Sequence, residues 1–189
     1  MTPPLNKTSG NHAVADRRYA IGALRGHWSP PAGVHWFLDP ALSDATLTTS
    51  HPVLGPRRYP LAIASGLLFG TEDAQFELTL NLAWPGKQKP LPVIFKSGSV
   101  SRPDLFRYLA KGDLYVGETA GIAVMRIHDL SWMTGTDETG LRILTMTTSL
   151  DRHFWEAADW ISRPWLTRNN VEAFLHTEWR PDCPVPPAA

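Results

Sequence analysis

Cysteine is almost absent from this sequence, since its 189 residues include only one, Cys183. A single thiol excludes a disulfide framework within the chain, and it excludes a zinc or iron–sulfur site built from several cysteines. Cys183 follows Pro181 and Asp182 in the C-terminal tail, where we expect neither a helix N-terminus nor an ordered base that would activate its thiol. We therefore predict no catalytic cysteine.

Long apolar runs are missing as well. No run reaches the roughly 18 residues that a membrane-spanning helix needs. The first ten residues contain one charged side chain, Lys7, and no apolar stretch of the kind found in a signal peptide. On these grounds we expect a cytoplasmic protein that does not enter a membrane.

The chain as a whole has no excess of either charge, because 18 Lys and Arg balance 18 Asp and Glu. This balance excludes a polycation or an acidic tail as a description of the entire protein. Locally the charge is uneven. Residues 57–112 carry eight basic and four acidic side chains, whereas residues 113–189 carry six basic and eleven acidic ones. The first block predicts an anion-binding surface, with chance clustering of surface charge as the alternative.

Alternation of apolar and polar residues predicts strands in the middle of the chain. From Phe76 to Leu82 every second residue is apolar, so one face of this strand should be buried and the other exposed. Residues 61–69 form another expected strand, in which Gly66 favours a bulge or a bend. Further strands are expected at residues 91–95, 114–117, 122–127 and 141–148.

A short helix is expected between the third and fourth of these strands. Ser101 suits an N-cap, Asp104 stands three residues later as in a capping box, and Gly112 would end the helix. Two more helices are expected over residues 151–161 and 170–178. The predicted organisation is a flexible arm (1–18), a β-barrel domain (19–148), a helical appendage (149–180) and a proline-rich tail (181–189).

Three strands, a short helix and two more strands are the layout of an OB-fold barrel, in which the helix closes one end. Four stretches of the chain resemble the corresponding parts of bacterial single-stranded DNA-binding proteins: Val93–Lys96, Leu105–Gly112, Leu114–Val116 and Arg126–Met133. This resemblance implies a mainly β protein. It implies a five-stranded, OB-like barrel with a capping helix between strands three and four. The helices expected at the C-terminus come from the residue pattern, and they replace the glycine-rich linker and acidic tip of that family.

The resemblance also implies a non-catalytic protein that binds single-stranded DNA or RNA as a homo-oligomer, without a cofactor or a metal. Cations would neutralise phosphates, and aromatic rings would stack on bases. The resemblance places Phe95 at a stacking position and Lys96 beside the nucleic-acid backbone, while an aromatic at a strand end also suits a core. The expected nucleic-acid-binding residues are Arg57, Arg58, Trp84, Lys87, Lys89, Phe95 and Lys96. Of these, Trp84 suits the core as well.

Two other functions are consistent with parts of the sequence. Tryptophans cluster near the C-terminus, and aromatic clusters of this kind are typical of interfaces. An assembly subunit that docks a protein partner through Trp155, Trp160 and Trp165 is therefore the main alternative. His27 and His35, with Asp39 four residues beyond, could in principle supply a metal site, but packing of this aromatic loop is the default interpretation.

Overall fold

The computed structural model describes residues 33–51, 55–71, 75–83, 89–104, 106–131, 141–151, 154 and 171–182. These segments form strands and one short 3-10 helix, η1 (Pro40–Leu42). The strands are β1 (His35–Leu38), β2 (Asp44–His51), β3 (Gly55–Gly70), β4 (Phe76–Ala83), β5 (Leu91–Ser101), β6 (Arg107–Val116), β7 (Thr119–Asp129), β8 (Arg142–Leu150) and β9 (Val171–Pro181). No helix in these segments is both long enough and apolar enough to cross a membrane.

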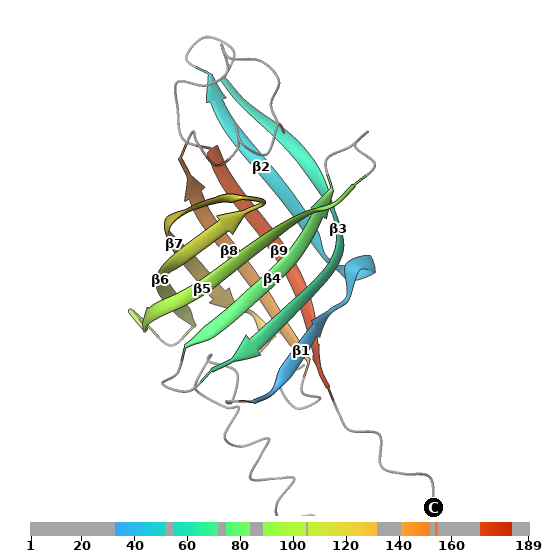
Figure 1. Cartoon of the computed structure of the whole chain (residues 1–189), viewed down its shortest axis with the longest axis vertical. Coiled ribbons are helices and arrows are strands. Elements are labelled where there is room, and N and C mark those ends of the chain that lie inside the picture. Colours follow the sequence, from blue (N-terminus) through green and yellow to red (C-terminus); the bar gives the residue numbers. More distant parts are fainter. Residues whose placement is uncertain are drawn as a thin grey trace, which may run out of the picture.

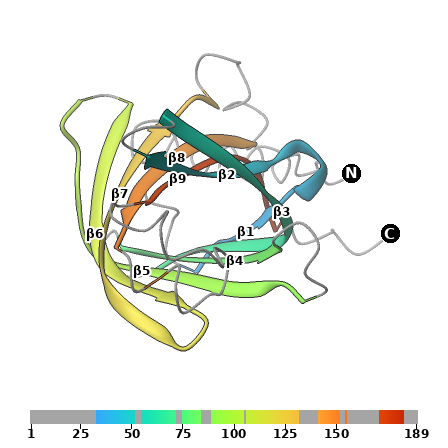
Figure 2. The same ribbon diagram turned by 90° about the horizontal axis from the view of Figure 1, so that it is seen from above.

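The strands form a closed antiparallel barrel (Figures 1 and 2). Each strand from β2 to β9 pairs with the next, and β9 pairs back with β2, so eight strands complete the ring. The short β1 precedes β2 and pairs with the same two neighbours, β3 and β9, at the lower end of Figure 1. Because the ring of β2 to β9 is closed, it has no edge strand.

Strand β4 shows why these sequences form a barrel wall. Its buried and half-buried residues alternate without interruption, and Phe76, Leu78, Leu80 and Leu82 all lie inside. The prediction from the alternating pattern is therefore confirmed. Every strand of the ring contributes buried apolar side chains, and these meet in one core.

The expected bulge near Gly66 is also confirmed. The register between β3 and β4 shifts between Ile63 and Ser65, after which Gly66 faces the interior. A Cβ atom on Gly66 would lie 2.9 Å from side-chain atoms of both Leu38 and Leu80. Glycine at this position thus lets the core side chains of β1 and β4 approach the main chain of β3.

The prediction of a helix over residues 101–112 is wrong, because this segment belongs to the β5–β6 hairpin. One oxygen of the Asp104 carboxylate accepts hydrogen bonds from the main-chain N–H groups of Phe106 and Arg107, and the other pairs with the Arg107 guanidinium. The hydrogen bond from Phe106 is the largest cause that lowers the pKa of Asp104. An acidic side chain that could cap a helix instead closes a turn.

The C-terminal half and the barrel type also differ from expectation. Residues 170–178 were expected to be helical, but Val171–Pro181 form β9, which alternates buried and exposed side chains and closes the ring. The mainly β class is confirmed, whereas the five-stranded OB count and the capping helix are wrong. The arm over residues 1–18 and most of the expected helix over residues 151–161 lie outside the described residues.

Candidate functional site in the barrel interior

An apolar cavity of about 40 Å³ lies inside the barrel, and its lining extends to Thr46 and to the exposed side chain of Phe174. Its walls come from strands all around the ring, with Leu47, Leu80, Phe95, Val116 and Met125 among the lining residues. A cavity of this volume exceeds the space that one water molecule needs, but a water molecule also needs polar partners. Because the lining is almost entirely apolar, the cavity suits an apolar group better than water.

Large aromatic side chains close the lower end of the barrel. Trp36 and Trp179 are both buried, and they lie on the inner faces of β1 and β9. The indole N–H of Trp179 donates to Thr177 Oγ1 over 2.8 Å, and the Thr177 hydroxyl donates to the carbonyl of Leu144 over 3.1 Å. This chain of hydrogen bonds fixes the ring of Trp179, whereas the buried indole N–H of Trp36 has no hydrogen-bond partner in the described structure.

An ion pair joins β7 and β8 at the same end. Arg142 Nη1 lies 2.8 Å from Asp129 Oδ2, and both side chains are largely buried. Asp129 Oδ1 accepts the main-chain N–H of Ser131, whose hydroxyl accepts the N–H of Ile143. These contacts bind β7 to β8 and give the lower end a structural role.

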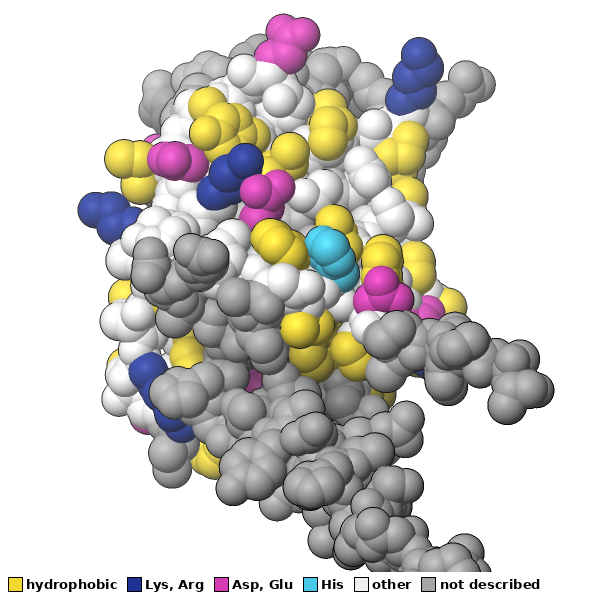
Figure 3. Space-filling view, turned by 60° about the horizontal axis from the view of Figure 1, so that its bottom comes forward, with side chains coloured by type: hydrophobic (Ala, Val, Ile, Leu, Met, Phe, Trp, Pro, Cys, Tyr) yellow, Lys and Arg dark blue, Asp and Glu magenta, His cyan; other side chains and the backbone are white. Residues whose placement is uncertain are grey.

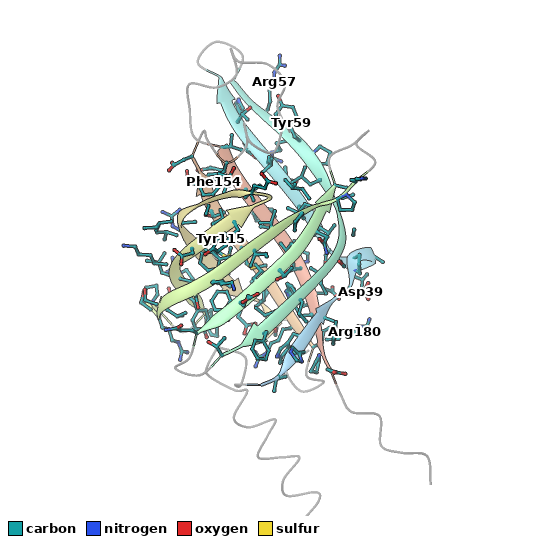
Figure 4. All side chains as sticks on the ribbon, viewed as in Figure 1. Asp39, Arg57, Tyr59, Tyr115, Phe154 and Arg180 are labelled. Atoms are coloured by element: carbon teal, nitrogen blue, oxygen red, sulfur yellow. The ribbon has the colours of Figure 1, made fainter. Side chains whose placement is uncertain are left out.

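The upper end has a different character, because the β2–β3 hairpin extends beyond the other strands (Figure 1). The register places three pairs on its inner face: Ala45 with Leu61, Leu47 with Tyr59, and Thr49 with Arg57. Thr49 is only 2% exposed, and its hydroxyl has no hydrogen-bond partner in the described structure. Arg57 is exposed, and Figure 4 shows it with Tyr59 on this hairpin.

The barrel wall is interrupted between β7 and β8 near the upper end. Pairing between these strands ends at Met125 and Thr148, although β8 continues to Leu150 and β7 begins at Thr119. The Thr148 hydroxyl donates to the carbonyl of Val124 over 3.0 Å, which ties the two strands just beyond the last pair. An outer groove of about 660 Å³ shares four lining residues with the inner cavity: Thr46, Thr148, Ala173 and Phe174.

The structure separates the residues expected to bind nucleic acid. Phe95 is 1% exposed, and its ring lies inside the barrel, 5.7 Å from that of Phe76. Lys96 is on the opposite face of β5, where its ammonium group lies 3.1 Å from a carboxylate oxygen of Glu77. The interior position of Phe95 agrees with the core alternative and leaves its ring unavailable at the surface.

The remaining expected residues are divided between exposed positions and undescribed ones. Arg57, Arg58 and Lys89 are exposed. Arg57 and Arg58 are adjacent on β3 and therefore point to opposite faces of the hairpin. The other expected nucleic-acid-binding and partner-binding residues lie outside the described segments: Trp84, Lys87, Trp155, Trp160 and Trp165.

The histidine loop has a structural explanation. His35 is the first residue of β1, and its ring stacks on Phe69 with a centroid separation of 4.7 Å. Asp39 caps η1 and pairs with Arg180 over 3.2 Å (Figure 4). His27 lies outside the described residues, and within them no cluster of three or more potential ligands could hold a metal.

The sequence analysis did not predict the interior cavity or the polar pair Thr49 and Arg57 at the upper end of the barrel. The available signal was the alternation in residues 107–116, where Tyr108, Ala110, Leu114 and Val116 lie inside. Small inward residues such as Ala45 indicate where a barrel leaves space, but only after the facing strands are known. Comparison with known proteins gives no guide, since no protein-family model and no curated protein matches this sequence.

Proposed function

We propose that this protein binds a small apolar molecule, or the apolar part of a larger one, inside its barrel. The observation that carries the proposal is the closed ring with an apolar cavity lined by strands on all its sides. Barrels of eight strands have interiors that are either filled by side chains or able to hold one small ligand. Because its cavity is small, this barrel is intermediate between a filled interior and one that holds a ligand.

The size of the cavity limits the ligand. At about 40 Å³ it is much smaller than the roughly 150 Å³ cavity known to take up benzene. A slender aliphatic chain fits best, because Met125 and the leucines of the lining can change rotamer to admit it. A chain that buries about 300 Å² gains about 7 kcal/mol, and association costs at least about 4 kcal/mol of this, so we expect dissociation constants in the millimolar range.

A titration with 1-octanol tests this proposal. Methyl NMR signals of the lining residues should shift on addition, among them those of Met125 and Leu80. Ala173→Val would fill part of the cavity and should weaken binding at least about tenfold, since Ala173 belongs to the lining. Ala62→Val, on the exposed face of β3, is the matched control and should leave binding unchanged. Unchanged methyl signals in the wild-type protein would refute interior binding.

Binding of single-stranded nucleic acid is the second candidate. Its support is the exposure of Arg57, Arg58 and Lys89, since cations at the surface attract phosphates. Two observations make it the weaker candidate: Phe95 is buried, and on the face in Figure 3 positive and negative side chains are interspersed. Docking of a protein partner through Trp155, Trp160 and Trp165 stays a prediction about undescribed residues.

A further inference from the structure

We infer that the natural ligand is an anionic amphiphile, namely an aliphatic chain with a carboxylate head. The chain would lie in the cavity, and the head would lie at the upper end between Thr49 and Arg57. This inference rests on the proposed function and specifies the chemical class of the ligand.

Thr49 supplies the first argument. Its hydroxyl is buried on the inner face of β2 and has no partner in the described structure, and an unpaired polar atom in apolar surroundings is unfavourable. Thr49 is two residues beyond Leu47 on the same face, a distance of about 7 Å along the strand. Because Leu47 lines the cavity, a polar group at the upper end of a bound chain would come within reach of this hydroxyl.

Arg57 supplies the second argument. It is directly opposite Thr49 in the β2–β3 pairing, so both residues belong to the inner face. The Arg57 side chain is exposed while Thr49 is buried, and the pair therefore spans the boundary between the interior and the solvent. No ion pair joins Arg57 to another residue of the described segments. A guanidinium group in this position matches a carboxylate, which it can bind through two parallel hydrogen bonds.

The same geometry ranks other head groups. An alcohol can hydrogen-bond to Thr49 but gains nothing from the positive charge of Arg57. An ammonium group is repelled by Arg57. The order of affinity for chains of equal length should therefore be carboxylate, then alcohol, then ammonium.

The test compares octanoate, 1-octanol and octylammonium by calorimetric titration of the full chain at low ionic strength. Octanoate should bind about tenfold more tightly than 1-octanol, as expected for a charge-assisted hydrogen bond. Arg57→Gln should remove that advantage and leave the affinity for 1-octanol unchanged. Arg58→Gln is the matched control, because this neighbouring arginine lies on the outer face of the hairpin.

Thr49→Val keeps the shape of the side chain and removes the hydroxyl. It should weaken binding of octanoate several-fold, and the variant should be at least as stable as the wild type, because the unpaired buried hydroxyl is gone. A circular dichroism melt verifies that each variant folds.

The outcomes separate the two proposals. If none of the three compounds binds, the proposed interior function fails, and this inference fails with it. If all three bind equally and Arg57→Gln changes nothing, apolar binding holds and the anionic head group is wrong. If Arg58→Gln weakens octanoate binding as much as Arg57→Gln does, the carboxylate adsorbs to surface charge, and the inference is overturned.

Discussion

Gly112 of β6 lies so close to the main chain of β5 that a Cβ atom at this position would overlap the carbonyl oxygen of Lys96. The same atom would lie 2.8 Å from the carbonyl carbon of Lys96 and from the Cα atom of Ser97. These neighbours are backbone atoms in a paired strand and cannot turn aside as a side chain can. Glycine is therefore required for β5 and β6 to pair at this point.

Replacing Gly112 with alanine should destabilise the protein by at least about 2–3 kcal/mol, because the strands must separate to admit the methyl group. Gly98→Ala is the matched control, since its Cβ atom would lie 3.7 Å from the carbonyl oxygen of Lys111, an ordinary contact. We expect this control to change stability by less than about 1 kcal/mol. Urea denaturation gives both values, and equal effects of the two substitutions would contradict the close approach.

The buried ion pair between Asp129 and Arg142 predicts a larger effect. Arg142→Met would leave the carboxylate of Asp129 largely buried without its cation, which should cost about 3–5 kcal/mol. Arg126→Met is the control, because Arg126 lies exposed on the outer face of β7 and should matter by less than about 0.5 kcal/mol. Both free energies of unfolding come from denaturant titrations. A loss below about 1 kcal/mol for Arg142→Met would mean that solvent reaches the pair.

Asp104 predicts a dependence of stability on pH. Its pKa is lowered in the folded protein, chiefly by the hydrogen bond from the Phe106 N–H and also by Arg107. The ionised carboxylate therefore stabilises the folded state at pH values above the ordinary pKa, and this stabilisation is lost as the pH falls through the folded value. Asp104→Asn should be less stable than the wild type at pH 7, and the difference should shrink in strong acid. Urea denaturation at pH 7 and in strong acid gives the difference in the free energy of unfolding between the two proteins. If this difference is the same at both pH values, the charge of the Asp104 carboxylate is not its cause.

The nucleic-acid candidate has its own test. If the exposed arginines of the β2–β3 hairpin bind phosphates, a fluorescent thymidine oligonucleotide should bind at about 50 mM salt and dissociate as salt is added. Replacing Arg57 and Arg58 together with glutamine should reduce the affinity and flatten its dependence on salt. Anisotropy measures both quantities. No binding by the wild-type protein at that salt concentration would remove this candidate.

Local patterns predicted the strand over residues 76–82 because both sides of β4 are paired and only one face is buried, which forces the period of two. The pattern failed over residues 101–112 because Leu105, Phe106, Tyr108 and Leu109 fit a helix as well as a strand. Asp104 also suits either a helix cap or a turn. The choice depended on the neighbouring strands β5 and β7, which a local pattern does not contain.

The candidate site could be predicted less well than the strands. Its two polar residues, Thr49 and Arg57, meet only because the β2–β3 hairpin has one particular register. The cavity depends on side chains from strands that are far apart in the sequence. Its small volume is the difference between the space inside the barrel and the total volume of the side chains that fill it. The buried position of Phe95 follows from its pairing with Leu78 and Leu114, both of which also face inward.

The pairing of β9 with β2 also has a consequence for synthesis on the ribosome. The N–H of Glu178 on β9 donates to the hydroxyl of Ser43, 135 positions earlier and directly before β2, so β9 completes a ring that β2 begins. Until β9 emerges, the growing sheet has two exposed edge strands and an uncovered apolar face. Contacts of such long range also slow folding. We therefore expect a nascent chain that stops before Val171 to bind chaperones rather than to fold into a smaller functional protein.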